Sequence, residues 1–238
     1  MKRVIAVAML VTVAGLTGCD RKSEKPKAEE PTESSAEDKE GAAKQKQKAE
    51  EPSPAADIDC DAKAKMTAGK KGELADDSPL LNPDKATAKA PKTFWVNFKT
   101  TAGPVVVQFH RDWSPHGVDR VYNLVEMGYY EHVAFFRVIE NFMAQFGIHG
   151  VPAVNEAWKE ASIPDDPVEK SNTRGMVTFA KKRTPNSRTV QLFINYKDNS
   201  ALDQKKFAPI GKVEKCMENV DALYAGYGEG APRGSGPS

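Results

Sequence analysis

The aromatic residues of this chain are confined to its C-terminal part, and this distribution decides where a core can form. The chain has 238 residues, and its first Phe, Tyr or Trp is Phe94. From about Asp20 to Pro91 it consists largely of Lys, Glu, Ala, Pro and Ser. The part from Asp20 to about Asp57 has almost no apolar side chain and cannot bury enough surface to offset the entropy lost on ordering. Asp57 to Pro91 leaves open an ordered arm at Pro79–Pro83 that lies on the domain. We therefore expect one folded domain, residues 91–228, preceded by a solvated linker and followed by a flexible tail, residues 229–238.

The N-terminus has the pattern of an export signal. Met1-Lys2-Arg3 is positively charged, and an apolar run follows it from Val4 to about Leu16. This run is shorter than the roughly 20 apolar residues that a helix needs to cross a bilayer. A positive start, a short apolar segment and small residues near its end are typical of a secretory signal peptide, here residues 1–18.

The end of this signal contains a cysteine in a specific context. Leu16-Thr17-Gly18-Cys19 resembles the lipobox of bacterial lipoproteins, which implies that Cys19 is lipidated and becomes the mature N-terminus. The alternative is an ordinary signal peptide with a chance cysteine. Acyl chains hold a soluble domain at a membrane, each buried methylene contributing about 0.8 kcal/mol. We expect an exported protein, anchored by lipid to a bacterial membrane and tethered by the charged linker 19–90.

Two cysteines remain if Cys19 is lipidated, Cys60 in the linker and Cys216 in the domain. Because an exported protein meets an oxidising compartment, a Cys60–Cys216 disulfide is a reasonable hypothesis. This disulfide would link the segment around Cys60, which includes Pro79–Pro83, covalently to the domain. Two free thiols are an equal alternative.

Short β-rich segments separated by turns dominate the domain. Phe94–Thr100 and Pro104–His110 flank a Gly-containing turn, which is a hairpin signature. Ser114 and Pro115 offer an N-cap and a first-turn proline for a helix that ends at Gly128. Many strands with two helices predict a closed antiparallel barrel with helical caps. The other expected elements are strands at Val133–Ile139, Phe142–Phe146, Gly175–Ala180, Val190–Asn195 and Phe207–Val213, a helix at Met217–Leu223, and irregular segments at 147–172 and 181–189.

One arginine lies in a run that is otherwise almost wholly apolar. In FFRVIENFMAQFG, Phe135–Gly147, aromatic and aliphatic side chains surround Arg137, and Gln145 lies near the end. A guanidinium stays protonated and is costly to bury unpaired. We therefore expect Arg137 at the rim of an apolar pocket that handles a largely uncharged substrate.

This run resembles the F-H-R-x-I-x-x-F-M-x-Q-G-G signature of cyclophilins, the peptidyl-prolyl cis–trans isomerases. Gln191–Ile194 is similar to their Q-F-F-I block, and Ala201–Asp203 and Ile210–Val213 to their W-L-D and F-G-K-V blocks. Order and spacing agree over about Phe94–Gly228. The resemblance implies an eight-stranded antiparallel barrel capped by two helices. It also implies an enzyme that needs no cofactor and accelerates rotation about X–Pro bonds, here in exported proteins.

The resemblance assigns the site residues as well. Arg137 takes the place of the catalytic arginine, and Gln145 that of the glutamine that holds peptide and arginine in place. The remaining substrate-binding positions are Phe142, Met143, Ala180, Phe193, Leu202 and Phe207.

Several positions depart from the family pattern, among them Phe207, which stands where eukaryotic members have a pocket histidine and bacterial members often have an aromatic residue. Phe136 replaces a histidine, Phe146 follows Gln145 where the family has glycine, and Ala201 stands where many members have a tryptophan. These departures leave a second function open, a non-catalytic chaperone or scaffold that binds Pro-containing segments through the same groove. The basic segment Lys181–Thr189 lies beside that groove in the resemblance, and it is either a solvated loop or a feature that favours acidic substrates.

Other classes of function fit the sequence less well. The formal net charge of +1 argues against a nucleic-acid binder, which usually carries a basic patch. The four histidines lack the paired spacing of a metal site. We expect a monomer whose partners are proline-containing polypeptides and, through the lipid anchor, a membrane.

Overall fold

The computed structural model describes residues 57–63, 74–131, 133–226 and 229. The predicted signal peptide, Cys19 and most of the linker lie outside these residues. Among the residues described, no helix has both the length and the apolar character needed to cross a bilayer.

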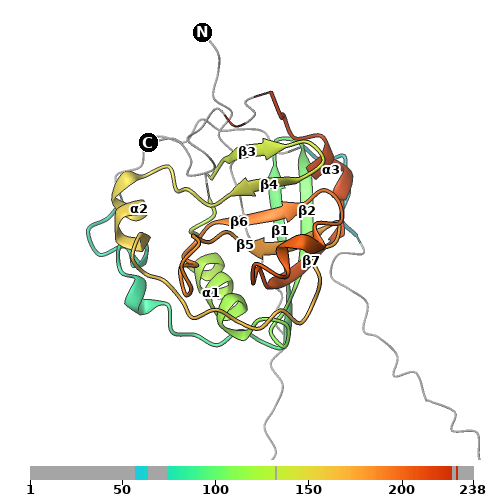
Figure 1. Ribbon diagram of the computed structural model, residues 1–238. Coiled ribbons are helices and arrows are strands. Elements are labelled where there is room, and N and C mark those ends of the chain that lie inside the picture. The colour runs from blue at the N-terminus through green and yellow to red at the C-terminus, as the bar shows by residue number, and fades with distance from the viewer. Residues whose placement is uncertain (1–56, 64–73, 132, 227–228, 230–238) are drawn as a thin grey trace, which may run out of the picture. The chain divides into compact units, whose positions relative to one another are not determined.

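Within the described part of the chain, seven strands form one sheet in the order β1-β2-β7-β5-β6-β4-β3 (Figure 1). All of the pairings are antiparallel. The strands are β1 (Thr93–Thr100), β2 (Gly103–His110), β3 (Phe135–Ile139), β4 (Met143–Phe146), β5 (Met176–Phe179), β6 (Leu192–Asn195) and β7 (Pro209–Lys215). Each of them overlaps a segment that the sequence predicts as a strand.

The prediction of a closed eight-stranded barrel is wrong. The two edge strands, β1 and β3, are not hydrogen-bonded to each other, so the described sheet is an open half-barrel of seven strands. Register shifts in three of the pairings bend and twist it. The segment before β5 does not supply an eighth strand, because Pro164 and Pro167 have no backbone N–H to donate. It forms an isolated bridge between Ile163 and Arg188 instead.

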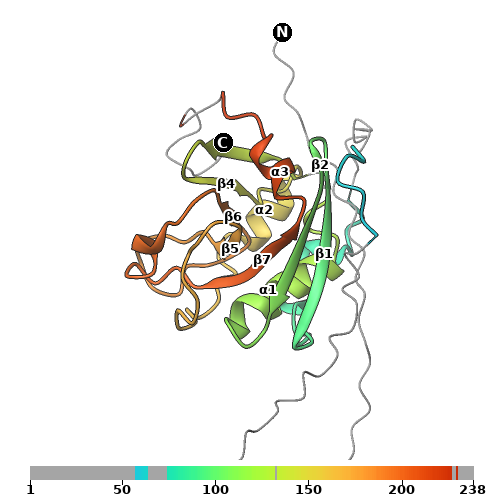
Figure 2. The same ribbon diagram turned by 90° about the vertical axis from the view of Figure 1, so that its right-hand side faces the viewer.

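The hairpin β1–β2 and the helix α1 (Pro115–Glu126) provide much of the core. Alternate residues of β1 point inward, and Phe94, Val96 and Phe98 are buried. The apolar face of α1 is buried as its helical spacing predicts, and Figure 2 shows the helix next to the hairpin. Phe98 contacts Tyr130 and Phe146 edge to face at ring distances of 6.1 and 5.8 Å. Such contacts fix the position of β4, which carries part of the pocket described below.

The structure contains a helix that the sequence did not predict, α2 (Pro152–Trp158), within the segment expected to be irregular. Two buried residues, Val154 and Trp158, dock this helix on the core. The Trp158 ring N–H donates to the carbonyl of Leu80 at 2.8 Å. It thereby holds the short 3-10 helix η1 (Pro79–Leu81) on the domain. A second 3-10 helix, η2 (Pro83–Lys85), follows.

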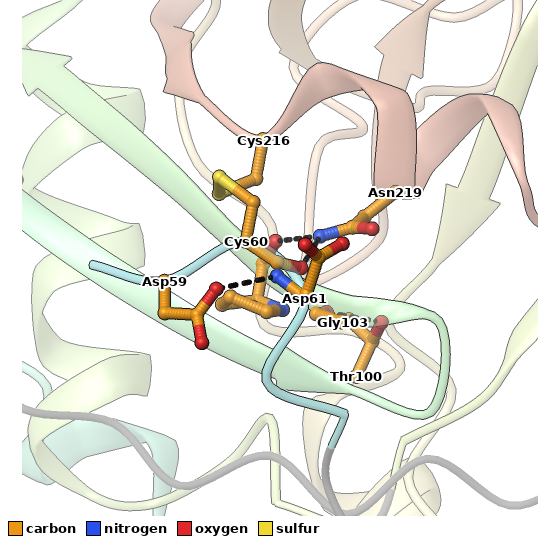
Figure 3. Close-up of a disulfide and its surroundings, with 8 residues drawn as sticks. Asp59, Cys60, Asp61, Thr100, Gly103, Cys216 and Asn219 are labelled. Carbon is orange, nitrogen blue, oxygen red and sulfur yellow. Dashed lines mark hydrogen bonds between the residues drawn. A yellow bond between two sulfur atoms is a disulfide. The ribbon is translucent and has the colours of Figure 1, made fainter.

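A disulfide joins Cys60 to Cys216 at the start of α3 (Met217–Asp221) (Figure 3). Asn219 donates to the carbonyls of Cys60 and Pro104 at 2.8 Å each, which adds the β1–β2 turn to the same junction. Gly103 is required here, because its φ is +131° and a Cβ would lie 2.7 Å from the Cys60 carbonyl. A disulfide that closes so long a loop, 156 residues apart in sequence, typically stabilises a domain by about 2–4 kcal/mol.

Candidate active site

Strand pairing places the two polar side chains of the FFRVIENFMAQFG run beside each other. Arg137 on β3 is the register partner of Gln145 on β4. The turn between the strands places Asn141 in the left-handed region at φ +58°, a conformation that asparagine tolerates better than most residues. Arg137 Nη1 then donates to Gln145 Oε1 at 3.3 Å. Its side chain is 19% exposed, so the guanidinium is only partly covered.

A pocket of about 180 Å³ opens beside this pair. Met143 and Gln145 face it together, because alternate residues of β4 point to one side. Phe193 on β6 is the register partner of Gln145 and comes next along the sheet. The far wall comes from the segment around the 3-10 helix η3 (Ser200–Leu202). The residues that line the pocket are Arg137, Phe142, Met143, Gln145, Ala180, Lys181, Phe193, Leu202 and Phe207.

Every residue that the sequence resemblance assigns to substrate binding therefore lines one pocket, together with Arg137. The structure adds Lys181, whose side chain is only 7% exposed. Its ammonium lies 5.6 Å from the ring centroid of Phe207 and 3.3 Å from a carboxylate oxygen of Asp165. The reading of Lys181–Thr189 as a solvated loop is wrong for Lys181 and for Arg188, which is buried. Adjacency to Ala180 was the available signal for Lys181.

A second glutamine, which the sequence analysis did not assign to the site, orients Gln145. Gln145 Nε2 donates to Gln191 Oε1 at 2.8 Å. This bond directs the carbonyl oxygen of the Gln145 amide toward Arg137, where it accepts the hydrogen bond described above. Arg137 also lies over the ring of Phe142 at 5.9 Å. The guanidinium is thus positioned by an acceptor on one side and an aromatic face on the other.

Hydrogen bonds to Asp203 hold the segment that forms the far wall. Asn172 donates to Asp203 Oδ1 at 2.7 Å and to the carbonyl of Phe207 at 2.8 Å. Ser171 donates to the same carboxylate at 2.5 Å. Burial acts to raise the pKa of Asp203, but these donors outweigh it and the pKa is lowered. Phe207 packs edge to face on Phe193 at 5.9 Å, which completes the wall.

Phe136, Phe146 and Ala201 lie outside the residues that line this pocket, whereas Phe207, which stands where eukaryotic members of the family have a histidine, lines it. Phe146 is buried on the opposite face of β4, where its ring lies 4.9 Å from that of Phe135. Phe136 is half-buried, and Ala201 is exposed. The walls of the pocket and the position of Arg137 therefore do not depend directly on these three side chains.

The arrangement suits a particular kind of chemistry. An apolar pocket binds an uncharged ring by removing it from water. A guanidinium at its rim presents several N–H donors in a fixed plane to a polar atom next to that ring. Such a site can bind a prolyl ring and hydrogen-bond its amide.

Comparison with known proteins identifies the family. The sequence model of the family described as cyclophilin type peptidyl-prolyl cis-trans isomerase/CLD matches residues 95–234, more than half of the chain. The chain belongs to this family. It is a cyclophilin-type peptidyl-prolyl cis–trans isomerase, and enzymes of this family act on proline-containing peptides.

The chain is similar to two curated bacterial proteins and to one solved structure, as follows. A probable peptidyl-prolyl cis-trans isomerase of Brucella abortus (strain 2308) is 34% identical over 141 residues, which cover 55% of this chain and 71% of the relative. A peptidyl-prolyl cis-trans isomerase of Acinetobacter baylyi is 30% identical over 132 residues, with 54% and 70% covered. A solved cyclophilin-type isomerase of Cryptosporidium parvum is 22% identical, with a TM-score of 0.47 and coverage of 54% and 82%.

Proposed function

We propose that Arg137 is the catalytic group of this isomerase and that the adjoining pocket holds the proline ring. Rotation about an X–Pro bond is opposed by amide resonance, with a barrier of about 18–20 kcal/mol. In the twisted state the proline nitrogen is no longer conjugated and gains a lone pair. A guanidinium donor bonds that nitrogen better in the transition state than in the ground state, so binding is differential and lowers the barrier.

The position of Arg137 at the pocket rim is the observation that carries this proposal. Gln145 and Phe142 hold the guanidinium there, while Met143, Phe193 and Leu202 supply apolar surface for the ring. Anchoring the ring lets the rest of the peptide turn about the X–Pro bond.

A protease-coupled assay on several X-Pro peptides tests the proposal. Uncatalysed exchange takes tens to hundreds of seconds, and the purified protein is expected to shorten it in proportion to enzyme concentration. A scaffold would instead bind a Pro-containing peptide, measured by titration, without changing the exchange rate. Binding without acceleration would therefore contradict a catalytic role and favour a chaperone or scaffold.

We also propose that the enzyme is exported and held at a bacterial membrane by lipid on Cys19, where it acts on exported proteins. The positive start, the short apolar run and the lipobox-like Leu16–Cys19 support this proposal. The charged linker that follows is long enough to let the domain reach substrates near the membrane.

Replacing Cys19 with serine is expected to move the protein from the membrane fraction to the soluble fraction, because no acyl chain can be attached. Fractionation followed by immunoblotting measures the change. Ser23→Ala, a substitution just beyond the Leu16–Cys19 motif, is the matched control and should leave the protein in membranes. Retention of the Cys19→Ser protein in membranes would show that another determinant holds it.

A further inference from the structure

The proposed catalytic arginine, Arg137, binds the side-chain carboxylate of Glu229 in the C-terminal segment. Glu229 Oε2 accepts from Arg137 Nε at 3.0 Å, and Glu229 Oε1 accepts from Arg137 Nη2 at 2.6 Å. This is the bidentate geometry in which arginine binds carboxylates most strongly. With Nη1 bonded to Gln145, each of the three guanidinium nitrogens of Arg137 donates a hydrogen bond within the protein.

The fold directs the C-terminal segment toward Arg137. Tyr196 donates to the carbonyl of Val220 at 2.9 Å, and Arg174 pairs with Asp221 at 2.6 Å, which together hold the end of α3. The residues that follow, Ala222–Ala225, line a surface groove together with Val138 of β3 and the turn after it. In Figure 1 this segment leads from α3 toward the side of the sheet where β3 lies. The chain thus runs beside the strand that carries Arg137.

The ion pair is suited to reversible occupancy. The Glu229 side chain is 55% exposed, whereas that of Arg137 is 19% exposed. Exposed ion pairs are screened by solvent and contribute little, so this contact can break without disturbing the core. The hydrogen bond from Arg137 lowers the pKa of Glu229, so its carboxylate is ionised and able to pair at neutral pH.

We propose that Glu229 is an intramolecular competitor, which competes with the substrate for Arg137. Its carboxylate must leave Arg137 before the guanidinium can bond a prolyl peptide. This inference rests on the role proposed for Arg137, and it adds a regulation of that site by the enzyme's own C-terminal segment. Acidic side chains on other polypeptides would compete for Arg137 in the same way.

Glu229→Gln is expected to lower KM for an X-Pro peptide about two- to fivefold at low ionic strength and to leave kcat unchanged, because the competitor acts on the free enzyme. A chain that ends at Gly228 should give the same result. Glu160→Gln removes the same charge from an exposed position on the segment after α2 and should match the wild type. In about 1 M salt, where the Debye length is roughly 3 Å, the difference in KM between wild type and Glu229→Gln should disappear.

Equal KM values for wild type and Glu229→Gln at low salt would overturn the inference, as would the same drop in Glu160→Gln. The NMR signal of the Arg137 Nε–H tests the contact without relying on catalysis, and it should move in Glu229→Gln but not in Glu160→Gln. An unmoved signal would overturn the contact itself. If none of the proteins accelerates isomerisation while the signal moves, the catalytic proposal fails and the occupancy of Arg137 by Glu229 stands.

Discussion

Replacing Arg137 with alanine is expected to lower kcat/KM for an X-Pro peptide by about 100- to 1,000-fold, the loss usually seen when a donor to the transition state is removed. The pocket would still bind the proline ring, because its apolar walls do not include the guanidinium. Most of the loss should therefore appear in kcat. Stopped-flow measurement of the protease-coupled reaction separates the two parameters.

Two further variants test whether the loss of rate is specific to the guanidinium of Arg137. Arg137→Lys keeps the positive charge but loses the planar set of donors, so it should recover little of the rate. Arg183→Ala removes an exposed arginine from the loop beside the pocket and should leave the rate close to that of the wild type. Circular dichroism should show that all three proteins remain folded. An unchanged rate in Arg137→Ala would refute the role that we assign to this residue.

Replacing Asp166 with alanine is expected to lower the free energy of unfolding by about 3–5 kcal/mol, because it leaves a buried arginine without its main partner. The side chains of Arg188 and Asp166 are 2% and 1% exposed, and their ion pair is 2.8 Å long. Asp166 also accepts from the Ser114 hydroxyl at 2.6 Å and from the backbone N–H of Gly117 at 2.9 Å. Its loss would therefore also leave N–H groups at the start of α1 without an acceptor.

Urea denaturation at neutral pH measures this change. Asp76→Ala removes an exposed aspartate and should alter the free energy of unfolding by less than about 0.5 kcal/mol. A loss below about 1 kcal/mol in Asp166→Ala would show that the buried pair matters less than its geometry indicates. The change should also weaken catalysis, because Asp165, next in sequence, pairs with Lys181 of the pocket wall.

The effect of pH on this pair has a definite sign. Burial acts to raise the pKa of Asp166, but hydrogen bonds from Ser114, Arg188 and the backbone outweigh it, and the pKa in the folded protein is lowered. The stabilisation is therefore fully present above the pKa of an unfolded aspartate, about 3.9. It is lost as the pH falls through the lower pKa of the folded state. The difference in the free energy of unfolding between wild type and Asp166→Ala should therefore become smaller in strong acid.

Local pattern was enough to predict much of the sheet, and the resemblance to cyclophilins predicted most of the pocket. The β-rich segments overlap all seven described strands, and buried residues alternate with half-buried ones along β1. Phe142, Met143 and Gln145 belong to one short run, and Phe193 lies on a strand paired to it. Their convergence therefore follows from neighbouring positions in the sequence and from strand pairing.

Ser114 shows where local pattern misleads. It was predicted to cap α1 with its side chain, but no such bond forms, and its hydroxyl donates to Asp166 instead. The helix begins at Pro115 as predicted and ends at Glu126, with Gly128 in the left-handed region two residues later. The cap is replaced because a buried carboxylate 52 residues away accepts from the first turn.

The sequence, through its resemblance to the cyclophilin blocks, thus identified every residue that lines the pocket except Lys181. Only the tertiary structure decided that the sheet stays open between β1 and β3, that α2 forms where Trp158 can be buried, and that Arg188 is enclosed. It also decided that Glu229 meets Arg137, at a sequence separation of 92. Such contacts depend on how distant segments pack, and no periodicity or local propensity records that packing.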